Sequence, residues 1–512
     1  MSMKYVIGVD IGTTSTKSLL FTKKGEIVAS HCIEYPLYSP SPAVAEQDPD
    51  EILSAVVDTI GQAVAKSEIN PEDVLCVSFS SAMHSVIAVD KEGVPLTKCI
   101  TWADNRSAEW TKKIKEEWNG HEIYRRTGTP LHPMSPLSKI TWLRYEHQSL
   151  FEQTYKFISI KEYVFYKLFG RYIIDYSIAT ATGMFNLHEM QWDEEALNIT
   201  GVTADRLSDP VPTTYKIAGM RQNYALQMNL PASTPFIIGA SDGVLSNLGV
   251  NAIEPGVVAV TIGTSGAIRA VTDKPVTDPK GRTFCYALTE DLWVIGGAVN
   301  NGGMIFRWVR DQIGTAEIEK AAELGIDSYE LLTELAAKAQ PGSDGLIFHP
   351  YLSGERAPLW DANARGSYFG LSLNHKKEHL IRAALEGVIF NLYAVALVLE
   401  ELIGKPSQIQ ATGGFARSEL WRQIMADIFN QEIYVPESVE SSCLGAAILG
   451  LYSIGEVSSL NVVSEMVGAS HYHQPNEQHV ERYLELLPIY IRTSQLFKEE
   501  FANIAAYQKK WV

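Results

Sequence analysis

One local pattern occurs twice in this chain, and it constrains the fold more than any other feature. Near the amino terminus, the apolar residues 5–9 lead into Asp10 and the turn Ile11-Gly12-Thr13-Thr14, and a second apolar run follows at 18–21. Residues 257–269 repeat the plan of an apolar strand, an Ile-Gly-Thr turn and a second strand. Each copy predicts a β-hairpin whose tip directs backbone N–H groups and hydroxyls toward an anion. The duplication predicts two similar halves.

Neither turn is one of the common phosphate-binding loops. The chain contains no Gly-x-x-x-x-Gly-Lys-Ser/Thr segment, and each turn leads into a strand rather than a helix. A single copy would be most simply an ordinary hairpin, but two copies predict a nucleotide held between two lobes. Paired hairpins of this kind resemble those of the actin, Hsp70 and sugar kinase superfamily. The resemblance implies an α/β fold with two ribonuclease-H-like domains around a central cleft.

The length of the chain agrees with two domains. At 512 residues it exceeds what one hydrophobic core normally covers, and 46% apolar residues suffice for packed cores. We therefore expect one domain over residues 1–245 and a second over residues 246–512.

Charge, cysteines and apolar segments exclude several classes of protein. A formal net charge of −17, with acidic and basic residues mixed, argues against a nucleic-acid or anionic-membrane surface. The 5 cysteines are scattered and lack a Cys-x-x-Cys spacing, so neither a disulfide scaffold nor a zinc site is expected. The amino terminus has no apolar signal core, and the longest apolar stretch, near residues 388–399, is too short to span a bilayer. We expect a cytoplasmic protein.

Apolar periodicity predicts a similar order of elements in the two halves. Three strands between residues 4 and 35 precede a helix over 51–67, which starts at Asp48-Pro49, and short strands at 74–79 and 86–89. The second half is predicted to have strands at 257–262, 267–271, 292–299 and 408–412 and helices near 302–313, 379–403 and 417–430. Mixed sheets covered by helices follow. Residues 105–235 are interpreted as an insertion that forms a substrate wall.

Two segments carry a narrower resemblance. Gly366-Ser367-Tyr368-Phe369-Gly370-Leu371, followed after seven residues by His379-Leu380-Ile381-Arg382-Ala383-Ala384-Leu385-Glu386, matches the carboxyl-terminal signature of the FGGY carbohydrate kinases at every constrained position. Residues 134–143, Met-Ser-Pro-Leu-Ser-Lys-Ile-Thr-Trp-Leu, resemble the other signature of that family, although Tyr145 stands where a polar or charged residue is usual. The resemblance covers nearly the whole chain.

Within the family, residues 80–90 and 100–107 are most similar to the gluconokinase branch. Xylulokinases typically place Gly-Gln before the Met-His pair and Gly after it, where this chain has Ser-Ala and Ser. The resemblance implies phosphorylation of D-gluconate to 6-phospho-D-gluconate, with ATP and Mg²⁺ as cofactors. Residues 1–245 would bind sugar, phosphate and Mg²⁺, and residues 246–512 would bind the nucleotide. The partner is then a small sugar acid, without nucleic acid or membrane, and a homodimer stays open.

Two alternatives stay open beside gluconate phosphorylation. A kinase of the same family could act on D-xylulose or another sugar. An Hsp70-like or actin-like ATPase would carry the same paired hairpins. The FGGY signature and the segments 80–90 and 100–107, which would bind sugar hydroxyls, argue against it.

Asp242 is the predicted catalytic base. It follows the apolar strand 236–240 and precedes Gly243 and a predicted helix, which is the context of the family's catalytic aspartate, and it would accept the proton of the sugar hydroxyl. Spacing alone would favour an Asp-Gly turn with a helix cap. Asp10 is expected to hold Mg²⁺ through water, because Mg²⁺ prefers one or two carboxylates together with phosphate oxygens.

Seven residues are expected to contact ATP: Thr13, Thr14, Lys17, Thr264, Gly303, Gly414 and Ser418. The threonines and Lys17 belong to the two hairpins and would touch phosphate oxygens, although Lys17 could be an exposed strand lysine. The segment 412–418 resembles the adenosine motif of the family, so Gly303, Gly414 and Ser418 would contact the nucleoside. The alternative is that these three residues only start helices.

Five residues besides Asp242 are expected to form the sugar-binding wall: Met83, His84, Trp102, Asp104 and Arg106. Asp104 can accept two hydroxyl protons, and His84 or Arg106 can donate to a hydroxyl or a carboxylate. Met83 and Trp102 could instead belong to the core, and His84 could be satisfied in packing. Glu355 and Arg356 are expected to form a buried ion pair without a chemical role.

Overall fold

A computed structural model describes residues 3–436, 440–468 and 470–511 of the chain, which forms two compact units. The first comprises Met1–Ile253, Val271–Ile295 and Glu440–Gly468. The second comprises Glu254–Ala270, Gly296–Val439 and Ala469–Val512. Neither unit is one continuous stretch of chain, because two later segments return to the first. The predicted class, mixed α/β with two domains, is confirmed.

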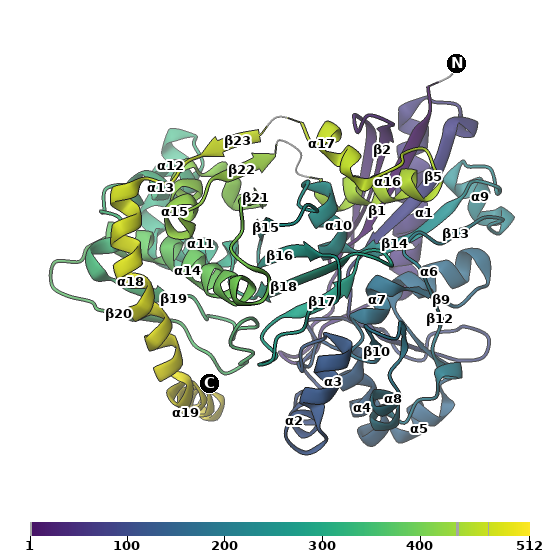
Figure 1. Cartoon of the computed structure of the whole chain (residues 1–512), viewed down its shortest axis with the longest axis horizontal. Coiled ribbons are helices and arrows are strands. Elements are labelled where there is room, and N and C mark those ends of the chain that lie inside the picture. Colours follow the sequence, from purple (N-terminus) through teal and green to yellow (C-terminus); the bar gives the residue numbers. More distant parts are fainter. Residues whose placement is uncertain (1–2, 437–439, 469, 512) are drawn as a thin grey trace. The chain divides into compact units, whose positions relative to one another are not determined.

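The first unit is built on a six-stranded sheet with the order β13-β14-β5-β1-β2-β3 (Figure 1). Strands β1 (Tyr5–Ile11), β2 (Ser15–Thr22) and β3 (Ile27–Glu34) are antiparallel neighbours. Strands β5 (Val74–Ser81) and β14 (Phe236–Ser241) run parallel to β1, and β13 (Lys216–Ile217) closes the edge. The chain order of three strands, a helix at residues 49–67 and a further strand is the one predicted for a ribonuclease-H-like unit.

Two helices from distant parts of the sequence cover this sheet. Helix α1 (Pro49–Ser67) starts where predicted, since the Asp48 side chain accepts hydrogen bonds from the first backbone N–H groups. Helix α16 (Ser441–Ser453) packs on β1 and β5 so closely that a Cβ on Gly8 would lie 2.0 Å from the carbonyl oxygen of Cys443. It also packs on α10 (Asp242–Gly249). The carboxyl-terminal segment thus completes the core under the first hairpin.

The other elements of the first unit lie mainly in the predicted insertion. They are β4 (Glu46–Gln47), η1 (Pro71–Asp73), β6 (Ile87–Val89), β7 (Cys99–Ile100), α2 (Ala108–Glu117), α3 (Gly120–Thr127), α4 (Pro136–Glu146), α5 (Gln148–Gln153), β8 (Lys156–Ile158), α6 (Ile160–Phe169), β9 (Ile173–Asp175), α7 (Tyr176–Thr180), β10 (Phe185–Asn186), β11 (Gln191–Trp192), α8 (Glu194–Thr200), η2 (Ala204–Arg206), β12 (Asp209–Val211), α9 (Gln222–Met228), β17 (Phe284–Ala287), η6 (Leu460–Val462) and α17 (Val463–Met466).

The second unit contains a sheet whose strands follow one another as β18-β16-β15-β21-β22-β23. Their bounds are β15 Val257–Ile262, β16 Gly266–Thr272, β18 Trp293–Val299, β21 Gln408–Thr412, β22 Ile433–Pro436 and β23 Ser470–His473. The remaining elements are α11 (Gly303–Trp308), η3 (Val309–Ile313), α12 (Thr315–Leu324), α13 (Ser328–Ala336), η4 (Ser343–Gly345), β19 (Ile347–His349), β20 (Ser367–Phe369), α14 (Lys377–Ile403), η5 (Gly414–Arg417), α15 (Glu419–Phe429), α18 (Glu477–Leu496) and α19 (Lys498–Trp511).

Helix α14 is longer than the apolar stretch that the sequence analysis considered. With 27 residues it is long and apolar enough to cross a membrane by length and composition alone. However, 78% of its most apolar window is buried inside the protein, as in a core helix. Length and composition are therefore weak evidence for a membrane span here.

Candidate active site

Asp10 lies at the end of β1, between two neighbouring strands. It pairs with Lys17 on β2 and with Ser80 on β5, and the Ser80 hydroxyl donates to its Oδ1 at 2.7 Å. Burial and the negative charge of Asp242 raise the pKa of Asp10 to about 6, although Ser80 and Lys17 act in the opposite direction. The fold thus brings the predicted metal ligand and the predicted base close enough to repel each other.

Asp242 is the first residue of α10, directly after β14. Its Oδ1 accepts a hydrogen bond of 2.7 Å from the Gly243 N–H. The strand that carries it bends at Gly239, where φ is +70° and a Cβ would lie 1.7 Å from the carbonyl oxygen of Phe79. Its register against β5 shifts between Ile237 and Ala240. Because only glycine fits this bend, Gly239 fixes the direction in which the chain leaves the sheet toward Asp242.

Lys17 is paired with Glu440, a residue far away in the sequence. Its Nζ donates to both carboxylate oxygens of Glu440 at 2.9 Å, across 423 positions of sequence. Burial lowers the pKa of Lys17, but the bond to Glu440 outweighs it, so the net shift is upward. Lys17 is therefore not simply an exposed lysine, because it forms an ion pair with Glu440. Its contact with phosphate stays a prediction.

The first hairpin contacts the predicted sugar wall. Trp102 donates through Nε1 to Thr13 Oγ1 at 2.9 Å, and Gln47 donates to the carbonyl oxygen of Thr13 at 2.5 Å. Thr14, at the tip, is exposed. Thr13, which is predicted to contact phosphate, is thus hydrogen-bonded to Trp102, which is predicted to contact the sugar.

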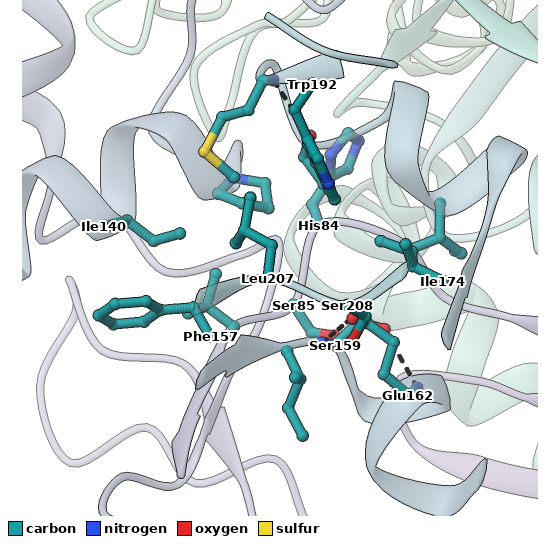
Figure 2. Close-up of a pocket in the computed structure, with 16 residues that line it drawn as sticks. His84, Ser85, Ile140, Phe157, Ser159, Glu162, Ile174, Trp192, Leu207 and Ser208 are labelled. Carbon is teal, nitrogen blue, oxygen red and sulfur yellow. Dashed lines mark hydrogen bonds between the residues drawn. The ribbon is translucent and has the colours of Figure 1, made fainter. Parts of the chain in front are cut away.

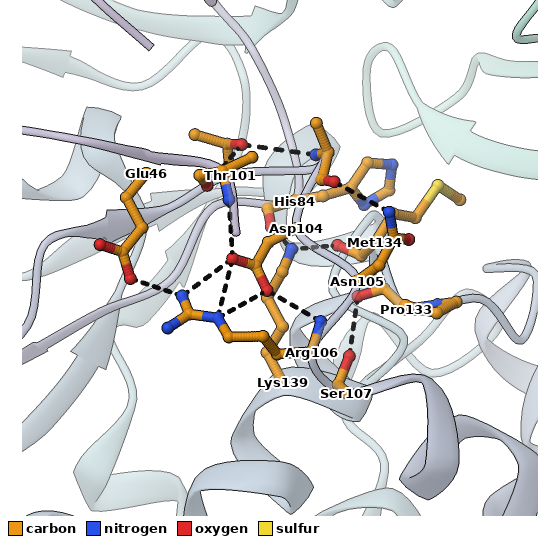
Figure 3. A network of polar contacts seen from close by, with 12 residues as sticks. Glu46, His84, Thr101, Asp104, Asn105, Arg106, Ser107, Pro133, Met134 and Lys139 are labelled. Carbon is orange, nitrogen blue, oxygen red and sulfur yellow. Dashed lines mark hydrogen bonds and ion pairs between the residues drawn. The ribbon is translucent and has the colours of Figure 1, made fainter. Parts of the chain in front are cut away.

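Asp104 and Arg106 form a closed polar network with Glu46 (Figure 3). Asp104 is 1% exposed, and its two oxygens accept from the backbone N–H groups of Ala45 and Arg106 and from Arg106 Nε, all at 3.0–3.1 Å. Arg106 Nη2 donates to Glu46 at 2.5 Å, and its guanidinium lies 4.8 Å from the centre of the Trp142 ring. Within the described part of the chain, Arg106 Nη1 has no hydrogen-bond acceptor. A contact from Asp104 to a sugar hydroxyl stays a prediction.

His84 is held at both its backbone and its ring. It has a φ of +68°, and only 6% of it is exposed. Its Nδ1 donates to the carbonyl oxygen of Ala181 at 2.7 Å, and the Tyr286 hydroxyl lies 3.4 Å from Nε2. Met83, the residue before His84, is half-buried against a small apolar cluster that includes Ile178 and Phe185. The core alternative for Met83 is therefore realised in part.

His84 is one of the residues that line a small cavity (Figure 2). Its volume of ≈ 20 Å³ admits a water molecule but not a sugar. Most of its lining is apolar, and Glu162 is the one carboxylate in it. Burial raises the pKa of Glu162 to about 6, although hydrogen bonds from Ser159 and Ser208 lower it. The cavity is too small to be the substrate site.

In the second unit, the predicted residues Thr264 and Gly303 lie side by side. Gly303 N–H donates to the carbonyl oxygen of Gly263 at 2.7 Å, and Met304 N–H donates to that of Thr264 at 3.1 Å. A Cβ on Gly303 would lie 2.6 Å from the Gly263 oxygen. The start of α11 is thus bound to the tip of the second hairpin, which leaves the Thr264 side chain exposed.

Gly414 is the first residue of the turn η5, which follows the neighbouring strand β21, and Ser418 comes directly after this turn. Strands β15 and β21 are parallel, so the hairpin tip and this turn lie at the same edge of the sheet. A Cβ on Gly414 would meet nothing within 4 Å, so open space adjoins its backbone. Ser418 caps α15, since its hydroxyl accepts from Trp421 N–H at 3.2 Å. The helix-start alternative is realised for Ser418, and its nucleoside contact stays a prediction.

Glu355 is buried, as expected, but amide groups surround its carboxylate. It accepts from Asn300 N–H at 2.5 Å, from the Asn301 side chain at 3.0 Å and from the Asn391 side chain at 2.8 Å. Burial raises the pKa of Glu355, while the bonds from Asn301 and Asn300 and the charge of Arg356 act against the shift. Arg356 donates to Glu355 through its backbone N–H at 2.8 Å, while its guanidinium donates to the Asn300 side chain and to the carbonyl oxygen of Val299, so the buried ion pair stays a prediction.

Comparisons with known proteins give the family of the chain. Residues 5–249 match the amino-terminal domain and residues 258–454 the carboxyl-terminal domain of the FGGY family of carbohydrate kinases. The chain is 58% identical over 507 residues to a gluconokinase of Bacillus subtilis, covering 99% of this chain and 98% of that protein. Two crystal structures from Lactobacillus acidophilus, of a gluconate kinase and of a ligand-bound xylulose kinase, have TM-scores of 0.93 at 38% and 37% identity. Each covers 98% of this chain and 100% of its own. The chain therefore belongs to the FGGY family of carbohydrate kinases.

Proposed function

We propose that this kinase transfers the γ-phosphoryl group of ATP to D-gluconate and forms 6-phospho-D-gluconate. The observation that carries the proposal is the high identity, over almost the whole chain, to the gluconokinase of Bacillus subtilis. The segments 80–90 and 100–107, which are most similar to the gluconokinase branch, also support it. Phosphoryl transfer asks the protein mainly for positioning, charge neutralisation and a group that orients the nucleophile and accepts its proton.

In this mechanism, Asp242 accepts the proton of the attacking hydroxyl, and Asp10 would hold Mg²⁺ through water. The charges support the metal role, because Asp10 and Asp242 repel each other and the nearby Lys17 is already paired with Glu440. Among the described residues, no group of three or more His, Cys, Asp and Glu could form a metal site. The single carboxylate of Asp10 fits Mg²⁺, because this ion can be bound through one carboxylate together with water and phosphate oxygens. When bound, Mg²⁺ would neutralise charge on the phosphates.

Each unit supplies one part of the remaining binding groups. In the first unit, Thr13, Thr14 and Lys17 would contact phosphate, while Met83, His84, Trp102, Asp104 and Arg106 would form or support the sugar site. In the second, Thr264 would contact phosphate, and Gly303, Gly414 and Ser418 would contact the nucleoside. The division of sugar and nucleotide binding between residues 1–245 and 246–512, the cytoplasmic location and a homodimer remain predictions.

Xylulose is the second candidate acceptor, because the xylulose kinase of Lactobacillus acidophilus is as similar in structure as the gluconate kinase. A coupled assay of ADP release with gluconate, xylulose, ribulose, glycerol and rhamnulose at equal subsaturating concentrations decides between them. We expect gluconate to give the highest rate. A higher rate with xylulose would replace the gluconate assignment, and ATP hydrolysis that no sugar stimulates would contradict both.

We expect Arg106→Lys to raise the KM for gluconate by about tenfold or more, because a charge-assisted contact to a carboxylate contributes roughly 1.5 to 3 kcal/mol. Arg106 Nη1 is the nitrogen left for that contact. Lysine keeps a positive charge beside the buried Asp104 but loses the fork geometry. Steady-state kinetics with gluconate and with a neutral sugar that the enzyme accepts measure the effect. An equal change in both KM values would assign Arg106 to the fold alone.

A further inference from the structure

Lys139, on α4, is buried in an unusual way. None of its surface is exposed, and its Nζ donates to the carbonyl oxygens of His84 at 2.7 Å and of Met134 at 2.5 Å (Figure 3). No carboxylate of the residues that the structure describes forms an ion pair with it. Fully buried lysines are rare unless they are paired. A lysine whose only partners are two carbonyl oxygens therefore requires an explanation.

The surroundings of Lys139 suit an uncharged amine. Burial lowers its pKa to about 7, Asp104 and Cys99 act against this shift, and the charge of Arg106 adds to it. An ammonium has three N–H donors, whereas the neutral amine has two. Two carbonyl oxygens match the neutral form without leaving a buried donor unsatisfied.

One of the two carbonyl oxygens belongs to a strained residue of the sugar-binding wall. His84 has a left-handed backbone, which residues other than glycine rarely adopt and which persists only where surrounding contacts hold it. Ala181 holds the ring of His84, and Lys139 holds its carbonyl oxygen. The second carbonyl oxygen, of Met134, belongs to the loop that leads into α4. Lys139 therefore joins the strained wall residue to the body of the insertion.

We propose that Lys139 is a positioning residue that clamps the backbone of His84 and thereby sets the geometry of the sugar site. The proposal rests on the assignment of His84 to that site. It goes beyond that assignment, because the side chain concerned is fully buried and acts only through the His84 backbone.

The first test is the kinetics of Lys139→Met, which removes the donors and keeps a side chain of similar volume. We expect the KM for the sugar to rise about ten- to hundredfold, since a displacement of about 1 Å costs roughly 10². The KM for ATP should stay within about twofold, because the predicted nucleotide residues lie elsewhere. Lys139→Gln keeps a group with two N–H donors, so its effect should be smaller.

Lys156→Met is a matched control. Lys156 also donates to two carbonyl oxygens, those of Asp205 at 2.8 Å and of Leu207 at 2.7 Å, in the same unit but with no wall residue among its partners. We expect its KM for the sugar to equal that of the wild type. A similar rise in Lys139→Met and Lys156→Met would mean that the loss of any lysine bound to two carbonyl oxygens loosens the unit, and it would overturn the clamp.

A double-mutant cycle with His84→Ala separates positioning from general stability. If Lys139 acts through His84, adding Lys139→Met to His84→Ala should change the sugar KM by less than about twofold, because the two effects are coupled. Full multiplication of the two effects would overturn the proposal. Should Lys139→Met not fold, the same cycle is run with Lys139→Gln.

All of these measurements use the sugar that the wild type phosphorylates fastest. The test of the Lys139 clamp then does not depend on whether that sugar is gluconate. If that sugar is xylulose, the gluconate proposal fails and the clamp is still tested. A folded Lys139→Met with an unchanged sugar KM overturns the clamp whatever the sugar is.

The pH dependence of unfolding gives a readout without activity. Because the folded pKa of Lys139, about 7, lies below the ordinary 10.5, the unfolded chain binds more protons between these values. Stability from this group therefore rises with pH over that window. The wild type should gain thermal stability relative to Lys139→Met between pH 7 and 10.5, and parallel curves would show that the amine is not buried as described.

Discussion

Asp242→Asn is expected to lower kcat by roughly 10² to 10⁴, the range for loss of a general base, while the protein folds and binds ATP as before. Asparagine has nearly the same shape, and its side-chain oxygen can still accept the hydrogen bond from Gly243 N–H. What it cannot do is take a proton from the sugar hydroxyl. The loss should therefore fall on kcat rather than on the KM for either substrate.

Single-turnover measurements with saturating sugar and ATP would isolate this step from product release. Asp48→Asn is a suitable control, because Asp48 is also an aspartate at a helix start in the first unit, and asparagine caps helices equally well. Its kcat should be that of the wild type. If Asp242→Asn also kept wild-type turnover, Asp242 would have no part in the chemistry, and the Asp-Gly turn with a helix cap would be its whole role.

The elements around Asp10 and Asp242 could be predicted from the sequence because their signals are local. Apolar runs and a Gly-Thr turn predict β1 and β2, and Asp48-Pro49 marks the start of α1, where the structure has it. Tyr145, which departs from the family signature, can also be explained by its local surroundings. Its ring is 47% exposed and stacks on Trp110, with centroids 4.3 Å apart, so the unusual residue lies at the surface.

Contacts between distant segments could not be predicted in the same way. Lys17 and Glu440 lie in unrelated stretches, and periodicity carries no information about which helix packs on which strand. The return of α16 to the first unit depends on the missing side chain of Gly8, which in sequence is only one residue of a strand. The compact units consequently include segments that a single cut in the chain would separate.

Roles of charged residues were also hard to predict from type alone. Asp104 has the chemistry to bind hydroxyl groups, yet in the structure backbone N–H groups and Arg106 occupy both of its oxygens. Residue type alone does not mark Lys139 and Lys161 as buried, because lysine is normally exposed. A signal was present, since each lies in a largely apolar run, Pro-Leu-Ser-Lys-Ile-Thr-Trp-Leu and Phe-Ile-Ser-Ile-Lys-Glu-Tyr-Val-Phe. Buried lysines in such runs are candidates for positioning roles.

The second buried lysine leads to the largest expected loss of stability. Lys161 Nζ lies 2.7 Å from Asp175 Oδ2 and also donates to the carbonyl oxygen of Ala240 at 3.1 Å, and both side chains are almost fully buried. Lys161→Met would leave the Asp175 carboxylate buried without its counter-ion. Removing one partner of a buried pair destabilises proteins by about 3 to 5 kcal/mol. We expect the urea midpoint of the first unit to fall accordingly.

The double variant Lys161→Met with Asp175→Asn separates the unpaired charge from other effects of the first substitution. Asparagine carries no charge and can still accept the hydrogen bond from Ile178 N–H that caps α7. The double variant should therefore regain most of the stability that the single variant loses. Equal midpoints for the two variants would show that the ion pair is not what the fold depends on. Lys161 also binds the carbonyl oxygen of Ala240, which lies two residues before Asp242. A double variant that regains stability but has a lower kcat than the wild type would therefore show that Lys161 also positions the catalytic aspartate through the strand that carries it.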